Sequence, residues 1–523
     1  NGELYLEYHR GTYKSQAYNK KMNRHMENCL TGVENLCAQA WILGAEYPQE
    51  MLDKIWQCVL LHQFHDIIPG SSVGEVYEDS LRNYEQAGRC LDTLQKEAAD
   101  AILEEEENAF VIYSSSGMAG KGLVCIHTEE EGYFEAEEGI LPAQRMSGGY
   151  CVLTQTKPYQ MKQIYFRPSA TMEKEQESFV IDLGRRRLET PFYVIVWTED
   201  GRICSLFDKE QERQVLEEGQ YGNVLEVFED KPLNYDAWDI DLFYLEKQER
   251  AGLVKPVEVI ENGTLRAVLR FTYGYRNSQI CQDMQVYRDS RRIDFVTTVD
   301  WKESHRLLKA AFYTNIHVVK ALYDIQFGYV ERPTHYNTSW DMARFEVCGH
   351  KWADISETGY GVSLLNDCKY GYNVYDNAMK ISLLKSAKYP DRQADIGIHQ
   401  FTYALLPHGG NVLEGKTMEE AGDLNAPSVV FAGRKCTGTT VVEVSSSAVQ
   451  IDAVKKAQKE DCLVVRVHEC RGSTVKFAFS SYFAIGKMVR CNLLEESIDE
   501  CAAEENITLR PFEICTVKIY PDI

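Results

Sequence analysis

The stretch AILEEEENAFVIYSSSG, residues 101–117, marks the point where the hydrophobic period of the chain changes. Before it, apolar residues recur every three or four positions, and after it they alternate with polar ones. A period near 3.6 predicts amphipathic helices, whereas a period of 2 predicts half-buried strands. The four consecutive acids at 104–107 are typical of a solvated helix end. We therefore expect a domain boundary near residue 108.

Residues 16–108 are predicted to form three helices. The first ends before Tyr47-Pro48, the second runs into the turn DIIPGSS, and the third opens at 72–75, whose Ser and Glu fit a capping box. Short connections between three helices favour an antiparallel bundle. The expected apolar face of the first helix consists of Met22, Met26, Cys29, Val33, Leu36, Cys37 and Ala40.

From residue 109 onward, some fifteen to twenty short segments with period 2 follow one another. The clearest spans 293–301, where alternate residues are apolar or Thr, and Phe401, Tyr403 and Leu405 repeat the pattern. Strands without long intervening helices favour antiparallel sandwiches over a parallel sheet. We predict an α+β multidomain protein whose three-helix bundle is followed by antiparallel β-sandwich domains. The expected β domains are a small one at 109–190, a large sandwich at 191–410 and a C-terminal domain at 411–523.

The amino-acid composition disfavours some classes of binding partner and bears on the cellular compartment of the protein. The 523 residues carry a net charge of −23, which disfavours binding to nucleic acid. No apolar run approaches the roughly 18 residues that span a bilayer, so no membrane is expected. The 16 cysteines show no CxxC spacing, and we interpret them as free thiols. Acidic charge and free thiols together favour a cytoplasmic protein.

Two glycine motifs resemble known functional signatures, one of a serine nucleophile and one of a phosphate-binding loop. Neither has the flanking structure or spacing that its signature requires. Residues 70–74 match GxSxG, but a nucleophile elbow needs a strand before the serine, and here helices flank it. Residues 117–122 place Gly120-Lys121-Gly122 after another glycine, in a spacing that fits no phosphate-binding loop. We predict that this second segment is a turn.

The segment LLHQFHD, residues 60–66, carries a stronger signal. His62 and His65 lie three positions apart, so they would share a helix face, and Asp66 follows directly. Histidine is a common zinc ligand, and a neighbouring carboxylate can orient it or contact substrate. The alternative to metal binding is that each histidine is an ordinary surface or core residue near a helix end. A zinc site needs three or four protein ligands, so the segment alone does not complete one.

Acidic and aromatic residues also gather in loops. The loop NYDAWDID at 234–241 places acids beside Tyr and Trp, which could line a sugar pocket. Asp367 lies in a predicted turn, and Arg392 in the polar loop YPDR. An ordinary surface loop explains each of these equally well.

Several long segments together resemble the α-mannosidases of glycoside hydrolase family 38. They are ELYLEYHRGT (3–12), LLHQFHDIIPGSS (60–72), GYVERPTHYNTSW (328–340), ARFEVCGHKWADIS (343–356), GVSLLNDCKYGYNV (361–374) and HQFTYALLPHGG (399–410). They occur in order across most of the chain and are similar to the cytosolic and bacterial branch of the family.

The resemblance implies an architecture and a missing part. In this family a barrel-like α/β domain precedes a three-helix bundle and β-sandwiches of the galactose-mutarotase supersandwich type. The chain begins within a motif, so residues 1–15 are expected to be a remnant of that first domain. The nucleophile and the general acid would lie outside this chain, which supplies no catalytic carboxylate of its own.

The resemblance also implies roles for individual residues. His65 would be one of four ligands of a zinc ion, leaving an incomplete site here, and Asp66 would contact sugar hydroxyls. Six further residues would bind substrate: His9, Arg10, Asp236, Asp239, Asp367 and Arg392.

The implied function is part of a zinc-dependent retaining α-mannosidase that acts on mannose-containing oligosaccharides. This chain alone is then expected to be inactive. The resemblance leaves room for a homo-oligomer. Two alternatives remain open: a non-catalytic carbohydrate-binding or interaction protein, and one chain of a split enzyme. The split enzyme predicts an unusually apolar exposed patch on the bundle.

Overall fold

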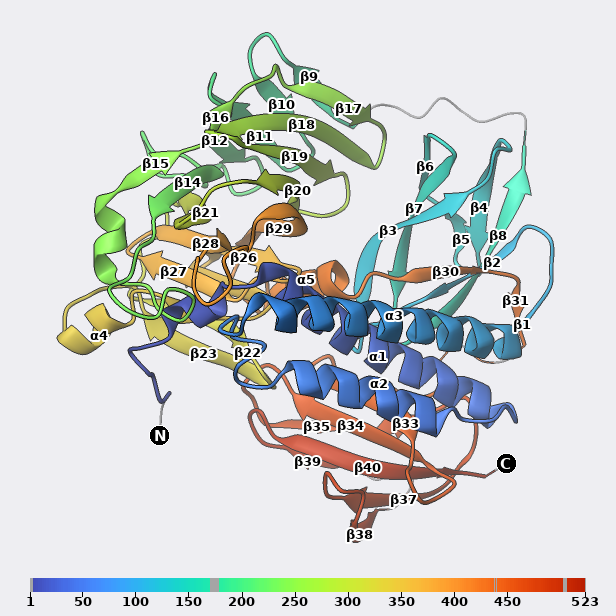
Figure 1. The fold of residues 1–523 in the computed structure, drawn as a ribbon. Helices are drawn as coiled ribbons and strands as arrows, with labels where there is room; N and C mark the ends of the chain where they lie inside the picture. The colour runs from blue at the N-terminus through green and yellow to red at the C-terminus, as the bar shows by residue number, and fades with distance from the viewer. Residues whose placement is uncertain (1–2, 170–177, 437, 439, 502–505, 523) are drawn as a thin grey trace.

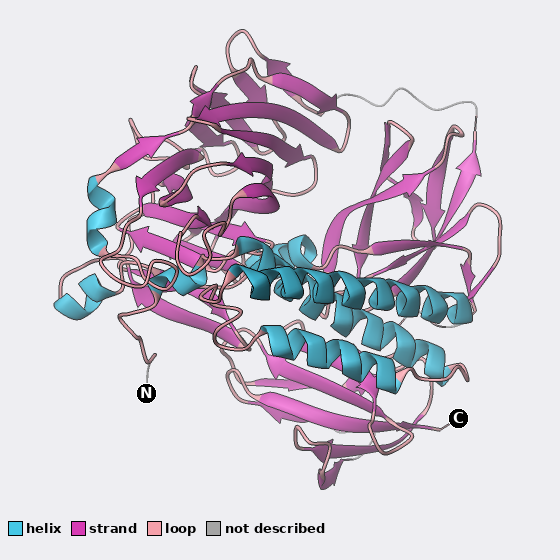
Figure 2. Ribbon diagram, viewed as in Figure 1, coloured by secondary structure: helices cyan, strands magenta, loops and turns pink. Residues whose placement is uncertain are grey.

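The computed structural model describes residues 3–169, 178–436, 438, 440–501 and 506–522. Three helices come first and nearly all later elements are strands, as Figure 2 shows by colour. The sheets are built from antiparallel pairs. The predicted fold class, a three-helix bundle followed by antiparallel sandwiches, is confirmed. Within the described ranges, no helix has the length and apolar character needed to cross a bilayer.

The bundle consists of α1 (Ala17–Ile42), α2 (Gln49–His62) and α3 (Gly74–Ile102). Helix α1 packs between the other two helices and the C-terminal sheet (Figure 1). Its side chains Met26, Leu30 and Leu36 are fully buried. Because α1 is covered on several sides, the apolar cluster runs without a break from the bundle into the C-terminal sandwich.

The predicted capping box at the start of α3 is wrong. The residue before α3 is Val73, and no side chain caps the helix there. The Ser72 hydroxyl instead donates a hydrogen bond to the main-chain oxygen of Asp66, 2.5 Å away. Ser72 therefore stabilises the preceding turn rather than the helix.

A small β unit follows, in which two sheets enclose a core with Phe134 and Phe166. Its strand β30 comes from 429–432 and pairs with β2, so this unit also uses a distant part of the chain. One sheet contains β30 (Val429–Ala432), β2 (Ala109–Tyr113), β8 (Met161–Pro168), β4 (Gly132–Ala136) and β5 (Gly139–Leu141). The other contains β3 (Gly120–His127), β7 (Gly149–Thr156) and β6 (Ala143–Met146).

The large β region contains a ten-stranded, a six-stranded and a five-stranded sheet. The pattern at 293–301 forms β20, and it pairs in register with the segment around Tyr403, which lies opposite Phe295. The ten-stranded sheet consists of β16 (Gly252–Leu253), β17 (Glu258–Asn262), β18 (Arg266–Tyr275), β19 (Ser278–Tyr287), β20 (Ile293–Trp301), β29 (Gly397–Gly409), β26 (Tyr360–Asn366), β25 (Trp352–Glu357), β22 (Lys320–Ile325) and β23 (Gly328–Pro333).

The other two sheets of this region and two short helices complete it. The six-stranded sheet consists of β15 (Gln248–Arg250), β14 (Val224–Glu229), β21 (Arg306–Tyr313), β28 (Ala378–Lys385), β27 (Gly371–Tyr375) and β24 (Val347–Cys348). The five-stranded sheet consists of β13 (Arg213–Gln214), β12 (Ile203–Asp208), β11 (Tyr193–Trp197), β10 (Arg187–Glu189) and β9 (Val180–Asp182). The short helices are α4 (Ser339–Ala343) and α5 (Thr417–Asn425).

The C-terminal sandwich packs against the bundle through β33, which contacts α1. Its main sheet consists of β33 (Val449–Lys456), β34 (Leu463–Glu469), β40 (Ile514–Pro521), β37 (Ile485–Cys491) and β38 (Ser497–Cys501). Its paired short strands are β32 (Glu443–Val444) with β36 (Phe479–Ser480) and β35 (Val475–Phe477) with β39 (Ile507–Leu509). Outside this sandwich, β1 (Leu103–Glu104) pairs with β31 (Arg434–Lys435) next to β2 and β8.

Candidate functional site

The segment before α1 packs against a loop of the large β region. Its helical turn η1 (Arg10–Tyr13) begins after His9, which adopts a left-handed conformation. The amide of Gly11 donates a hydrogen bond to Trp238 O at 2.8 Å, and the Ser15 hydroxyl donates to Ala237 O at 2.6 Å. A Cβ atom on Gly11 would lie only 2.6 Å from Ala237 O. Only glycine allows the two segments to lie this close.

This packing brings three predicted site residues together: His9, Arg10 and Asp239. The His9 ring contacts the Trp238 ring edge-on, with centroids 4.5 Å apart. Arg10 is buried, and one of its guanidinium nitrogens lies 3.6 Å from Asp239 Oδ1. Arg10 also donates to Ala343 O at 2.9 Å. Its guanidinium group is therefore directed into the protein, where it fixes neighbouring loops.

The other two predicted residues of this loop pair contact the segment 387–395. Asp236 accepts a hydrogen bond from the Lys388 amide at 2.6 Å, while its second oxygen faces His305 at 3.4 Å. Arg392 exposes its side chain, and its main-chain oxygen accepts from Lys388 Nζ at 2.7 Å. Both loops thus form one wall beside the segment that carries His9.

The turn between α2 and α3 presents His65 and Asp66. The His65 side chain is 78% exposed, and its Nε2 lies 3.5 Å from a carboxylate oxygen of Asp66. The His65 ring also contacts the Phe64 ring at a centroid distance of 4.2 Å. An exposed imidazole with a carboxylate beside it is suited to bind a metal or an incoming ligand.

The prediction that His62 and His65 share a helix face is wrong. Helix α2 ends at His62, so His65 lies beyond the last turn. The His62 ring is buried against Tyr84, with centroids 4.7 Å apart, and both of its nitrogens lack hydrogen-bond partners. Burial lowers the pKa of His62, which favours its neutral form.

A buried lysine joins this turn to the segment before α1. Lys20 Nζ donates hydrogen bonds to Ser15 O and, at 2.7 Å, to Ile68 O. Burial lowers the pKa of Lys20 to about 7. The turn containing His65 is therefore attached to the same segment that carries His9 and Arg10.

Asp367 lies apart from this set. It follows β26, and its carboxylate accepts a hydrogen bond from the Thr402 amide of β29 at 2.9 Å. Its second carboxylate oxygen is buried without a hydrogen-bond partner. Its contacts are thus with the ten-stranded sheet rather than with the loops that carry the other predicted residues.

A network of buried charges packs against the segment before α1, and the sequence analysis did not identify it. Lys14 Nζ lies 2.9 Å from Glu346 Oε2, while Lys309 and Tyr244 contact the other carboxylate oxygen. Burial raises the pKa of Glu346, but the charges of Lys14 and Lys309 outweigh it and lower that pKa to about 2. Because Lys14 and Glu346 lie at opposite ends of a long stretch of sequence, no local pattern reveals their contact.

Large apolar side chains are exposed at the same end of the molecule. In Figure 1 the N-terminal segment, α4 and the α2–α3 turn all lie toward the left. The segment 3–8 lies beside residues 343–346, since the Tyr5 hydroxyl donates a hydrogen bond to Glu346 O at 2.7 Å. We define the apolar face by these exposed residues: Leu4, Leu6, Tyr8, Leu60, Leu61, Phe64, Val73, Leu233, Tyr235, Trp340, Met342 and Tyr389.

The metal-ligating side chains at this end do not complete a site. Among the residues that the structure describes, no group of three or more His, Cys, Asp and Glu side chains could hold a metal ion. His65 and Asp66 offer one nitrogen and one carboxylate, which suits part of a zinc site.

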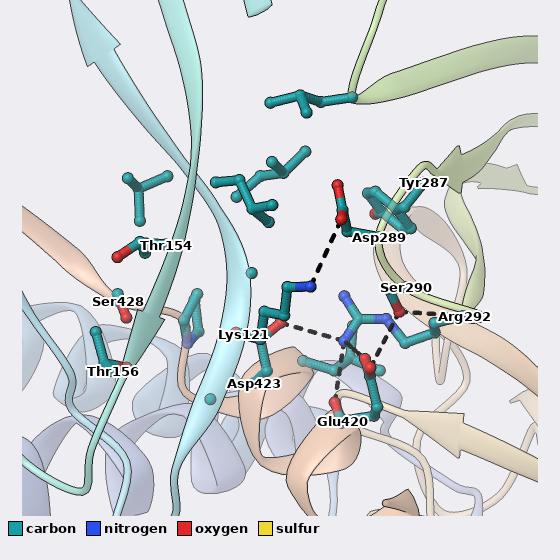
Figure 3. A pocket seen from close by; sticks show the side chains of 18 of the residues that line it. Lys121, Thr154, Thr156, Tyr287, Asp289, Ser290, Arg292, Glu420, Asp423 and Ser428 are labelled. Atoms are coloured by element: carbon teal, nitrogen blue, oxygen red, sulfur yellow. Dashed lines mark hydrogen bonds and ion pairs between the residues drawn. The ribbon is translucent and has the colours of Figure 1, made fainter. Parts of the chain in front are cut away.

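Away from the residues described so far, a polar pocket lies between the small β unit, the β19–β20 connection and α5 (Figure 3). Its volume is about 180 Å³. Arg292 contacts Glu420 at 3.1 Å and Asp423 at 3.2 Å, and Lys121 lies 3.6 Å from Asp289. These charges are paired with one another, so they join the small β unit to its neighbours.

The prediction that the glycine motif at this pocket forms a turn is only partly correct. Gly120, Lys121 and Gly122 begin strand β3 rather than forming the predicted turn. A Cβ atom on Gly122 would lie 2.6 Å from a carboxylate oxygen of Asp423. Glycine is needed here because α5 packs closely against the strand.

A larger cavity of about 450 Å³ lies where the bundle meets the β domains. Trp56, Trp352 and Tyr370 contribute aromatic rings to its wall. His468 contacts Asp452 at 2.8 Å in the same lining. Aromatic rings beside paired polar groups are typical of small-molecule pockets.

Three family models match the chain. They are the alpha mannosidase middle domain at residues 7–102, the glycosyl hydrolases family 38 C-terminal domain at 188–393, and the glycosyl hydrolases family 38 C-terminal beta sandwich domain at 448–517. The matched ranges contain the bundle, the loops around Asp236 and the C-terminal sandwich.

Characterised relatives match over nearly the whole chain. Alpha-mannosidase G of Dictyostelium discoideum is 34% identical over 99% of this chain and 52% of its own length. Alpha-mannosidase 2C1 of Homo sapiens is 33% identical over 99% of this chain and 50% of its own length. The chain thus spans about half the length of the curated relatives it matches.

A solved structure has the same fold. The alpha-mannosidase from Enterococcus faecalis V583 aligns with a TM-score of 0.82 and 16% identity, covering 98% of this chain and 68% of that one.

Proposed function

Because the chain belongs to glycosyl hydrolase family 38, with that family's middle and C-terminal domains, we propose that it forms part of a retaining α-mannosidase. The substrates would be α-mannosidic bonds in mannose-containing oligosaccharides. The observation that carries this proposal is that the relatives aligned over 98–99% of the chain are all named alpha-mannosidases. Retaining glycosidases need a nucleophile and a general acid. We place both in the part of the relatives' length that this chain does not span.

The proposed role of His65 is to bind a zinc ion together with ligands from that other part. Support comes from the exposed imidazole and from Asp66 beside it, 3.5 Å away. When bound, zinc would act as a Lewis acid toward substrate oxygens. Asp66 would hold His65 in place and accept hydrogen bonds from sugar hydroxyls.

The neighbouring loops would form one wall of the substrate pocket. We assign His9 and Trp238 to a surface against which a sugar ring can pack. Arg10, Asp239 and Asp236 would keep this wall rigid, because their charged groups already contact the protein. The exposed Arg392 side chain remains available to contact substrate.

The apolar face would be covered by the catalytic domain. Its side chains include Trp340, 77% exposed, and Tyr389, 71% exposed. Exposed apolar side chains gathered on one face are typical of an interaction site. The occupant would be a further domain of the same protein or, in a split enzyme, a separate chain.

We also place the protein in a reducing compartment such as the cytoplasm. The cysteines that the structure describes are free thiols, and several of them are exposed. Exposed free thiols persist where small thiols keep the compartment reducing.

The direct test is hydrolysis of an aryl α-mannoside by the purified 523-residue chain, with and without added zinc. We expect no turnover above background, because neither catalytic carboxylate is assigned to this chain. Robust, zinc-dependent turnover would contradict the assignment of the nucleophile and acid to another part.

A second candidate function is carbohydrate binding without catalysis, favoured by the cavity of about 450 Å³ with its aromatic wall. Calorimetric titration with methyl α-mannoside would test it. Saturable heat that the Trp56→Ala variant loses would support this alternative, and the absence of heat at millimolar sugar would exclude it.

A further inference from the structure

Two cysteines face each other across neighbouring strands of the small β unit. Cys125 on β3 lies directly opposite Cys151 on β7, and their sulfur atoms are 3.8 Å apart. Side chains directly opposite on antiparallel strands project from the same face of the sheet. A disulfide needs a sulfur–sulfur distance of about 2.0 Å, so a closure of roughly 2 Å would join them.

The two thiols differ in their access to solvent. Cys125 is exposed, whereas Cys151 is fully buried. A small molecule can therefore reach Cys125 first. Cys151 can then react only with a partner that is already bound to its neighbour.

The two thiols also differ in reactivity. The hydrogen bond with Cys151, together with the charges of Arg266 and His127, lowers the pKa of Cys125 to about 6, against the opposing effect of burial. The same hydrogen bond, together with burial, raises the pKa of Cys151. Since the thiolate is the nucleophile, Cys125 is the attacking sulfur at neutral pH.

We propose that Cys125 and Cys151 form a reversible thiol–disulfide pair that exchanges with small disulfides. The Cys125 thiolate attacks one sulfur of the small disulfide, forms a mixed disulfide and releases the first small thiolate. Cys151 then gives up its proton and attacks the Cys125 sulfur, which releases the second small thiolate. The proton from Cys151 passes to a leaving thiolate. The other small thiolate takes up the proton that Cys125 had released to solvent, so the two protein thiols become a disulfide and the small disulfide becomes two thiols.

The pair lies beside a contact between two parts of the protein. Gln144 on β6 is opposite Cys151, and its side-chain oxygen accepts hydrogen bonds from the amides of Leu265 and Arg266 at 2.7 and 2.8 Å. Arg266 therefore both contacts this sheet and lowers the pKa of Cys125. The exchange site thus depends on the contact between the small β unit and the β17–β18 hairpin. It is independent of the proposed glycosidase activity.

The test uses the whole reduced chain and oxidised glutathione at pH 7, followed by alkylation and peptide mapping by mass spectrometry. We expect a cross-linked peptide pair containing Cys125 and Cys151, reversed by dithiothreitol. In the Cys151→Ala variant, glutathione should instead remain attached to Cys125. The Cys125→Ser variant should form neither product, and Cys204→Ser, which changes another exposed thiol, should behave as the unchanged chain.

A rate measurement separates the pair from an ordinary exposed thiol. Burial raises the pKa of Cys204. At pH 7, Cys125 should therefore react with a chromogenic aryl disulfide about tenfold faster than Cys204. Equal rates for the two thiols, or glutathione that stays on Cys125 in the unchanged chain, would overturn the proposal.

Discussion

The ammonium group of Lys20 on α1 donates a hydrogen bond to the main-chain oxygen of Ile68, 2.7 Å away in the turn between α2 and α3. The same group also donates to Ser15 O. One buried side chain thereby joins the segment that carries His9 and Arg10 to the turn that carries His65 and Asp66. The relative position of the two halves of the candidate site depends on this link.

Replacing Lys20 by Met should destabilise the chain. The substitution leaves two carbonyl oxygens, of Ser15 and Ile68, without this donor, which costs about 1–3 kcal/mol for buried groups. Urea denaturation would measure the free energy of unfolding. The control is Lys21→Met, because Lys21 makes a single exposed hydrogen bond, to Gln400 O. Equal effects of the two substitutions would argue against the link.

The stability of the wild type should also depend on pH through Lys20. Burial lowers its pKa from the ordinary 10.5 to about 7 in the folded chain. Between these values the unfolded chain binds more protons, so the free energy of unfolding rises with pH. Relative to Lys20→Met, the wild type should gain stability as the pH is raised from about 7 to about 10. A difference that stays constant over this range would contradict the shifted pKa.

Glu346→Gln should be strongly destabilising at neutral pH. It leaves Lys14 and Lys309 without the carboxylate that they share, and breaking a buried ion pair costs about 3–5 kcal/mol. The pKa of Glu346 is lowered to about 2, against an ordinary 4.5, so its contribution is present above pH 4.5 and is lost as the pH falls toward 2.

Glu50→Gln is the matched control for that substitution. Glu50 pairs with Lys54 at 2.7 Å on the surface of α2, where a salt bridge contributes little. Thermal melts of both variants at pH 7 would compare them. Similar losses for Glu50 and Glu346 would contradict the network.

Two glycine substitutions should act in opposite directions. A methyl group at Gly11 would meet Ala237 O at 2.6 Å and Trp238 C at 2.8 Å, so Gly11→Ala should separate the segment from its loop. Gly88, inside α3, has open space at that position. Gly88→Ala should therefore raise the free energy of unfolding by about 0.5–1 kcal/mol through helix propensity. Denaturation curves showing the same sign for both would contradict the close packing.

Much of the fold follows from hydrophobic period alone. The change of period after residue 108 correctly separated the helices from the strands, and the alternation at 293–301 identified β20. Pairing between distant segments could not be predicted in this way. Strand β30 at 429–432 joins the sheet of β2, and nothing local to either strand indicates that partner. The domain boundaries near 108, 190 and 410 stay predictions.

The candidate site was harder to predict from the sequence than the fold was. The resemblance drew attention to His9, Arg10, Asp236 and Asp239. It did not point to Trp238, which contacts His9, or to Lys20 and Glu346, which contact the segment before α1 or the turn after α2. The prediction for Ser72 was wrong because its hydroxyl donates to Asp66 O and its side chain does not accept a hydrogen bond from an amide of α3. Local patterns identify polar residues at a turn, whereas only the folded chain decides what each of them contacts.

The most direct test of the account is the activity of the protein expressed from the complete open reading frame that encodes this chain. Hydrolysis of an aryl α-mannoside and bound zinc would be measured for the wild type, His65→Ala and, as a control at a partly exposed histidine, His335→Ala. Loss of a metal ligand should lower kcat/KM by about 100-fold or more and reduce the zinc content, with His335→Ala unchanged. Full activity and full zinc content in His65→Ala would contradict the assignment of His65.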